Sequence, residues 1–188
     1  MLVRYLLVTL LVLAMPAVAA EPLESIPAIE RRIPPAGIEV PEAELAMLQQ
    51  RLGELEQQLS TYQDHKLQPD VEVYTKAVAW ALKFGEFYNS KDTAKANRLL
   101  DEAARRLEQI SAGKTDWTST TGLVVHGYRS SIDGSVQPYG LEIPEDFSPS
   151  RATPLYVWLH GRGDKTTDMH FIDQRQTRKG RIAPAGAI

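Results

Sequence analysis

The most informative stretch of the sequence is LYVWLHGRGD, at residues 155–164. Its first half is a continuous apolar run, which is typical of a β-strand buried on both faces. Its second half is a His-Gly-x-Gly loop, whose glycines let the backbone turn sharply and approach another molecule closely. Together they predict a buried strand over residues 155–159 that ends at a functional loop.

A loop of this kind suits acyl-transfer chemistry. Attack on an ester or amide places negative charge on the carbonyl oxygen, and backbone N–H groups that are fixed beforehand stabilise that charge. Losing one such donor costs roughly 3–4 kcal/mol. A plain strand-ending turn is the alternative interpretation of the loop.

Two β-rich stretches precede the apolar run. Residues 121–129 and 135–143 flank the turn signal at residues 133–134, Asp-Gly, and this pattern predicts a β-hairpin. Pro138 has no amide hydrogen to donate, which favours an edge or a bulge for the second strand.

The loop is followed by little further structure. A short helix is expected over residues 168–176, and residues 183–188 offer only the beginning of another strand. A buried strand needs neighbours in its sheet, and an exposed edge is a liability. We therefore expect an incomplete sheet over residues 114–188 and a chain that is the N-terminal part of a longer protein.

Three helices are predicted over residues 42–113. The first carries a leucine stripe at spacings of three and four residues, the pattern of a heptad repeat. The second begins near Pro69, and the third is capped by Asp92 and ends before Gly113. The stripe predicts either packing of the three helices against one another or self-association through a coiled coil.

The N-terminus has the pattern of an export signal. Residues 1–20 combine Arg4, an apolar run and a small-residue segment, so cleavage is expected near Ala19 or Ala20. The apolar run is shorter than the roughly 20 residues that a spanning helix needs. We therefore expect a secreted or periplasmic protein with no membrane association after cleavage, in which residues 21–41 form a Pro-rich linker.

Composition excludes some partners. Removing the signal, whose only charged side chain is Arg4, leaves 20 Lys and Arg against 24 Asp and Glu, a formal charge of −4. A mildly acidic chain argues against a nucleic-acid partner. The chain has no cysteine, so its stability must come from a buried core rather than from disulfides.

Two stretches carry a resemblance to a known family. They are GYRSSIDGSVQPYGL at residues 127–141 and LYVWLHGRG at residues 155–163, in that order after a helical segment. Together they resemble the opening of the α/β-hydrolase superfamily, in its secreted prolyl-oligopeptidase-like and esterase branch. The resemblance covers about the final third of the chain. It implies an α/β fold in which the helical segment precedes the first strands of a hydrolase sheet.

The resemblance also implies roles for the loop. An oxyanion hole would form at Gly161, Arg162 and Gly163, with the backbone N–H of Arg162 as one donor, while His160 would shape the loop. A Ser-His-Asp triad would act on a small-molecule ester or peptide, with no cofactor and no metal. No catalytic residue is expected within these 188 residues, because they contain no Gly-x-Ser-x-Gly.

The function predicted from these observations is that of the N-terminal part of an exported serine hydrolase. The alternatives are a non-enzymatic exported helical interaction module and a catalytically inactive hydrolase relative. The basic cluster at residues 175–181 favours a solvated loop, with binding of a substrate carboxylate as its alternative. Trp80 and Trp158 are expected in the core.

Overall fold

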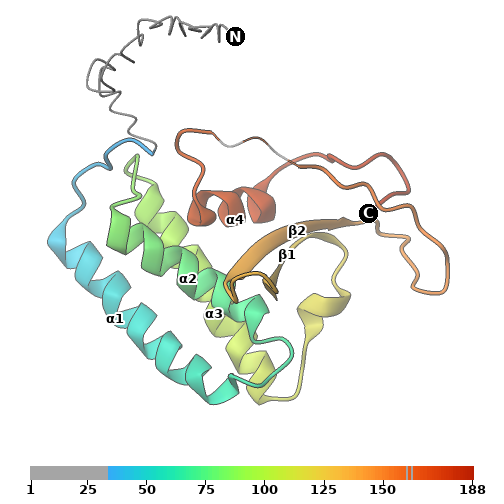
Figure 1. Cartoon of the computed structure of the whole chain (residues 1–188), viewed down its shortest axis with the longest axis horizontal. Coiled ribbons are helices and arrows are strands. Elements are labelled where there is room, and N and C mark those ends of the chain that lie inside the picture. The colour runs from blue at the N-terminus through green and yellow to red at the C-terminus, as the bar shows by residue number, and fades with distance from the viewer. Residues whose placement is uncertain (1–33, 160, 162) are drawn as a thin grey trace, which may run out of the picture. The chain divides into compact units, whose positions relative to one another are not determined.

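Three long helices form where the sequence places its start and stop signals (Figure 1). The computed structural model describes residues 34–159, 161 and 163–188, so the predicted signal peptide and most of the linker lie outside the described residues. The helices are α1 (Glu42–Leu59), α2 (Pro69–Phe84) and α3 (Asp92–Ser111). Pro69 opens α2, and Gly85 ends it in the left-handed conformation, with φ of 65°. The three helices predicted over residues 42–113 are confirmed.

One detail of α3 differs from expectation. Asp92 is its first residue and makes no cap to its own helix. Its carboxylate instead accepts the backbone N–H groups of Tyr88, at 2.7 Å, and Asn89, at 3.1 Å. The side chain therefore stabilises the loop that leads into the helix.

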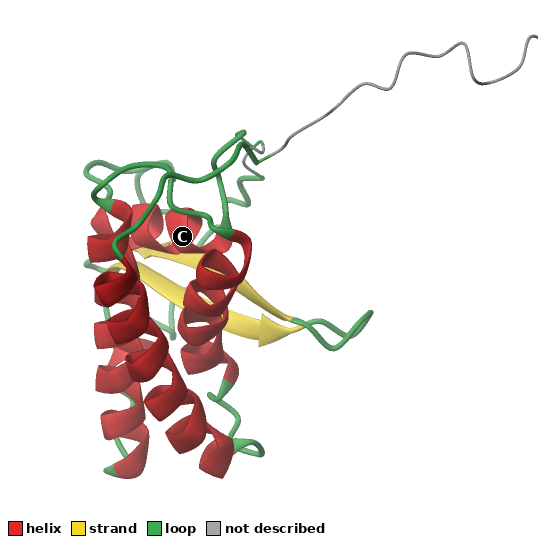
Figure 2. Cartoon of the chain, turned by 90° about the vertical axis from the view of Figure 1, so that its left-hand side faces the viewer, coloured by secondary structure: helices red, strands yellow, loops and turns green. Residues whose placement is uncertain are grey.

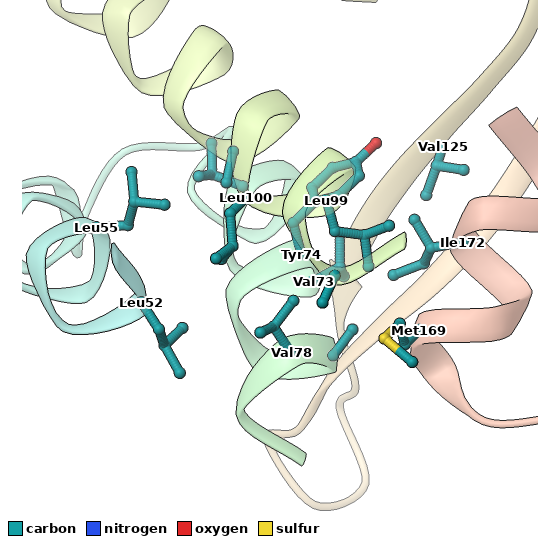
Figure 3. Close-up of a cluster of buried hydrophobic side chains, with 14 of the residues drawn as sticks. Leu52, Leu55, Val73, Tyr74, Val78, Leu99, Leu100, Val125, Met169 and Ile172 are labelled. Carbon is teal, nitrogen blue, oxygen red and sulfur yellow. The ribbon is translucent and has the colours of Figure 1, made fainter. Parts of the chain in front are cut away.

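The leucine stripe of α1 faces the other helices. Leu48, Leu52, Leu55 and Leu59 are all buried, in contact with α2 and α3. Figure 3 shows Leu52 and Leu55 directed toward these two helices. These leucines pack against the other helices of the same chain, which agrees with the interpretation of the stripe as a packing surface. They do not form an exposed apolar seam.

The predicted hairpin is present. Strand β1 (Gly122–Arg129) pairs with β2 (Val136–Ile143) in antiparallel register, with Gly122 opposite Ile143 and Arg129 opposite Val136. Figure 2 shows the turn between the strands projecting away from the helices. The sheet formed by the described residues has these two strands alone, so the structure is a mixed helical and antiparallel fold and shows no hydrolase-type sheet.

A fourth helix, α4 (Asp168–Thr177), covers the hairpin and confirms the short helix expected over residues 168–176, so the described residues form four α-helices, one more than the three of the helical segment. Two short 3-10 turns, Ser60–Tyr62 and Asp116–Ser119, complete the regular elements. Met169 and Ile172 of α4 lie beside Val125 of β1 and Val73 of α2 (Figure 3). Helices and hairpin thus share one hydrophobic core.

The prediction of a buried strand over residues 155–159 is wrong for this structure. No strand is assigned there, and the five apolar side chains are 46–88% exposed. A strand buried on both faces needs paired neighbours and covering layers. In the part of the chain that the structure describes, the exposed side of this segment has no paired strand and no covering layer.

The expectation that Trp80 and Trp158 lie in the core is also wrong, since they are 44% and 46% exposed. Trp117, in the second 3-10 turn, is the buried tryptophan of the described residues. Within those residues, no helix is long and apolar enough to cross a membrane.

Candidate functional site

The apolar segment at residues 154–159 is held by the end of the chain. The N–H of Tyr156 donates to the carbonyl of Ile188 at 2.7 Å, and the N–H of Ile188 donates to the carbonyl of Pro154 at 3.0 Å. These two bonds follow the pattern of a parallel strand pair, with Leu155 opposite Ile188. Helix α4 lies between the two segments in sequence, as the crossover of a parallel connection does.

The predicted oxyanion loop follows this segment. His160 and Arg162 lie outside the described residues, so the donor expected at Arg162 is not placed. A Cβ added to Gly161 would meet no described atom within 4 Å. At Gly163, a Cβ would lie 2.8 Å from Oγ1 of Thr166, and only a glycine fits that turn without a shift.

A cavity of about 600 Å³ adjoins this segment. One wall is the run at residues 155–159, and the opposite wall is residues 138–142 of β2. Phe171 and Arg175 of α4 contribute, and residues near the C-terminus complete the lining. The lining is mainly apolar and reaches Leu159, two residues before Gly161. Its size lies in the range of small-molecule binding sites.

The basic cluster at residues 175–181 divides between two environments. Arg178 and Lys179 are exposed, as a solvated loop would have them. Arg175 is instead buried, with its guanidinium over the rings of Trp158, at 5.1 Å, and Phe171, at 5.6 Å. The expectation of a solvated loop is therefore wrong for Arg175. This residue lies on α4, and its side chain is directed toward the sheet.

A buried carboxylate, Asp70 of α2, forms a second polar site. It accepts hydrogen bonds from Nε1 of Trp117 at 2.9 Å, from Nδ1 of His126 at 2.9 Å and from the N–H of Gly127 at 2.7 Å. Burial raises the pKa of Asp70, but the bonds from His126, Trp117 and Gly127 outweigh it and lower the pKa. Asp70 is therefore ionised at neutral pH.

The Asp70–His126 pair has the form of two members of a catalytic triad without the third. The ring of His126 stacks on Tyr139, with centroids 5.7 Å apart, and among the residues that are described no hydroxyl hydrogen-bonds its imidazole. The pair joins α2, the 3-10 turn and β1. Its geometry is that of a structural junction rather than a nucleophile-activating pair.

Two other polar residues of α4 make contacts with neighbouring helices. His170 lies 3.2 Å from the Asp92 carboxylate, and Asp168 pairs with Lys76 at 2.9 Å. Over the described ranges, no three His, Asp or Glu side chains are grouped as metal ligands.

Sequence reasoning missed both the cavity and the Asp70 site. A single aspartate in the first turn of an amphipathic helix carries no signal of burial, because acidic residues are common there. The cavity is formed by β2, α4 and the chain end, which are far apart in the sequence. Only the apolar run at residues 155–159 pointed toward this place.

Comparisons with protein-family models, with curated proteins and with solved structures found no match.

Proposed function

We propose that the chain is the N-terminal part of an exported serine hydrolase acting on ester or peptide bonds. Its loop at residues 160–163 would stabilise the oxyanion, and its Ser-His-Asp triad would lie outside these 188 residues. The observation that carries the proposal is the position of the loop. It follows the carboxyl end of an extended segment that is hydrogen-bonded in the parallel pattern.

Two physical arguments support this. In open α/β sheets, ligands bind outside the carboxyl ends of parallel strands, which is where the loop begins. In addition, a Cβ on Gly161 would meet no described atom within 4 Å, which suits close approach of a substrate to the backbone there. The adjoining cavity would take the apolar portion of an ester.

The test is labelling of the natural protein with a fluorophosphonate, after isolation with an antibody against residues 42–113. We expect one labelled serine in the same polypeptide, mapped by mass spectrometry to a Gly-x-Ser-x-Gly beyond residue 188. The first residue of the isolated protein should be Ala20 or Glu21, because the signal is expected to be removed. Gly161→Val should slow labelling by about 100-fold or more, since it would disturb the donors of the oxyanion hole.

Gly53→Ala serves as the matched control, because a Cβ on Gly53 would meet no atom within 4 Å on the exposed side of α1. This variant should label at the unaltered rate. A folded natural protein with no reactive serine would contradict the hydrolase proposal. Equal labelling rates for the two variants would contradict the role of the loop.

A further inference from the structure

Arg175 is a buried cation without an ion-pair partner among the described residues. It is 8% exposed, and it lines the apolar cavity. Its Nη2 donates to Oε1 of Gln174 at 3.1 Å, while its Nε is buried and has no hydrogen-bond partner. An unpaired donor on a buried charge is costly, because neither water nor the protein replaces its lost solvation.

The nearest acidic residue of the cavity wall does not serve as that partner. Glu142 accepts the N–H groups of Ile182, at 2.8 Å, and Ala183, at 3.2 Å, and it pairs with Arg181 at 3.2 Å. Its carboxylate is thus bonded to three other donors, and no ion pair joins it to Arg175 in the described part of the chain. The guanidinium of Arg175 instead lies over the faces of two aromatic rings, which attract a cation but carry no negative charge to pair with it.

The position of the guanidinium is set by its surroundings. A Cβ on Gly140 of β2 would lie 3.0–3.3 Å from the aliphatic stem of Arg175, so the absence of a side chain there gives the stem its place. Burial lowers the pKa of Arg175, and the charge of Arg178 lowers it further, while Glu142 raises it. The group remains charged at neutral pH, because an arginine keeps its proton throughout that range. The site is therefore a fixed positive charge at the wall of an apolar cavity.

We propose that this cavity binds a monocarboxylate with an extended apolar body, of the fatty-acid type. The carboxylate would accept hydrogen bonds from the guanidinium of Arg175, and the hydrocarbon would lie along the apolar walls. Arginine and carboxylate form strong charge-assisted hydrogen bonds, and such bonds would supply the ion-pair partner that Arg175 lacks among the described residues. A cavity of about 600 Å³ has room for a chain of about twelve carbons. The inference does not depend on the hydrolase proposal, because it concerns binding alone.

The test is calorimetric titration of the 188-residue chain with dodecanoate, below its micellar concentration, against 1-dodecanol. The two probes share their hydrocarbon and differ in the charged group. We expect saturable one-to-one binding of dodecanoate that is at least tenfold tighter than binding of dodecanol. Arg175→Met should bring the ratio of the two affinities close to one while leaving dodecanol binding in place.

Arg178→Met is the matched control, because it removes an exposed charge three residues away on the same segment. This variant should keep the preference for dodecanoate. Near-ultraviolet circular dichroism of each variant establishes that the fold is retained. Three outcomes would overturn the proposal: equal affinity for both probes, a preference that survives in Arg175→Met, or no binding of either probe by the folded chain.

Discussion

Asp70 concentrates several contacts in one side chain. Its carboxylate accepts hydrogen bonds from Trp117, His126 and Gly127, which belong to the 3-10 turn and to β1. The backbone carbonyl of the same residue accepts a hydrogen bond from the buried Arg106 of α3, at 3.0 Å. A single residue at the start of α2 therefore connects the helices with the hairpin.

We predict that Asp70→Ala destabilises the protein by roughly 3–5 kcal/mol, because it leaves several buried donors without an acceptor. Since the pKa of Asp70 is lowered by folding, its contribution is present above the unfolded pKa of about 3.9 and is lost as the pH falls through the folded pKa. The difference between the two proteins should therefore shrink below about pH 4. Urea denaturation at several pH values measures it.

Asp101→Ala is the control for this prediction. Its carboxylate pairs with Arg51 at the surface and is 68% exposed, so the loss should stay below about 1 kcal/mol. A destabilisation by Asp70→Ala as small as that of the control would contradict the role assigned to the buried carboxylate.

At the scale of elements, β1 approaches the first turn of α2 too closely for a side chain. A Cβ on Gly127 would lie 2.0 Å from the carbonyl oxygen of Pro69 and 2.8 Å from Cγ1 of Val73. The strand can lie against the helix because this residue has no Cβ. Helix and strand positions are thus coupled through one glycine.

We predict that Gly127→Ala costs roughly 1–3 kcal/mol or more, because the strand must move away from the helix. Gly53→Ala, within α1, should instead stabilise the protein by about 0.5–1 kcal/mol, because glycine weakens a helix interior relative to alanine. Thermal unfolding of the two variants gives the comparison. Similar melting temperatures would contradict the close packing of β1 on α2.

The elements differ in how far the sequence predicts them, for a physical reason. The helices and the hairpin carry local signals, such as the leucine stripe, Pro69 and the turn at residues 133–134, and the structure confirms the elements that these signals predict. The segment at residues 155–159 has only its apolar character, which indicates burial without naming a covering partner. Whether such a run is paired and buried depends on segments that are distant in the sequence. The predicted strand over residues 155–159 is therefore absent from the structure.

The candidate site likewise depends on segments that are distant in the sequence, and for that reason the sequence predicts little of it. The cavity beside residues 155–159 has walls from three distant segments, which no local pattern brings together. Arg175 stands in a basic cluster that indicates solvent exposure, and only its contact with Gly140 of β2 and the rings beside it reveals the burial. The loop prediction itself stays a prediction at His160 and Arg162.

At the scale of the whole described molecule, we expect the helices and the hairpin to unfold together, because they share one hydrophobic core. The core is continuous from α1 to α4, and Trp117 lies at the junction, with the guanidinium of Arg106 5.2 Å from its ring. We predict that Trp117 fluorescence and the helical circular dichroism signal share one midpoint in urea, as in a two-state transition. The variant with Trp80→Phe and Trp158→Phe makes Trp117 the only tryptophan.

The outcome that would contradict this coupling is a Trp117 transition at a clearly lower urea concentration than the helical one. It would mean that the hairpin and its turn separate while the three long helices stay folded. The matched measurement on the unsubstituted chain shows whether the two replacements themselves change the midpoint.

Lys76 of α2 has an amine held by parts of the chain that are distant in sequence. Its Nζ donates to the carbonyl of Val136 on β2, pairs with Asp168 of α4 and lies 4.6 Å from the ring of Trp80. We expect an amine held in this way to react slowly with acylating reagents, and the exposed amine of Lys91 to react faster. The extent of acetylation at Lys76 relative to Lys91 thus measures the fraction of molecules in which β2 and α4 are docked on α2.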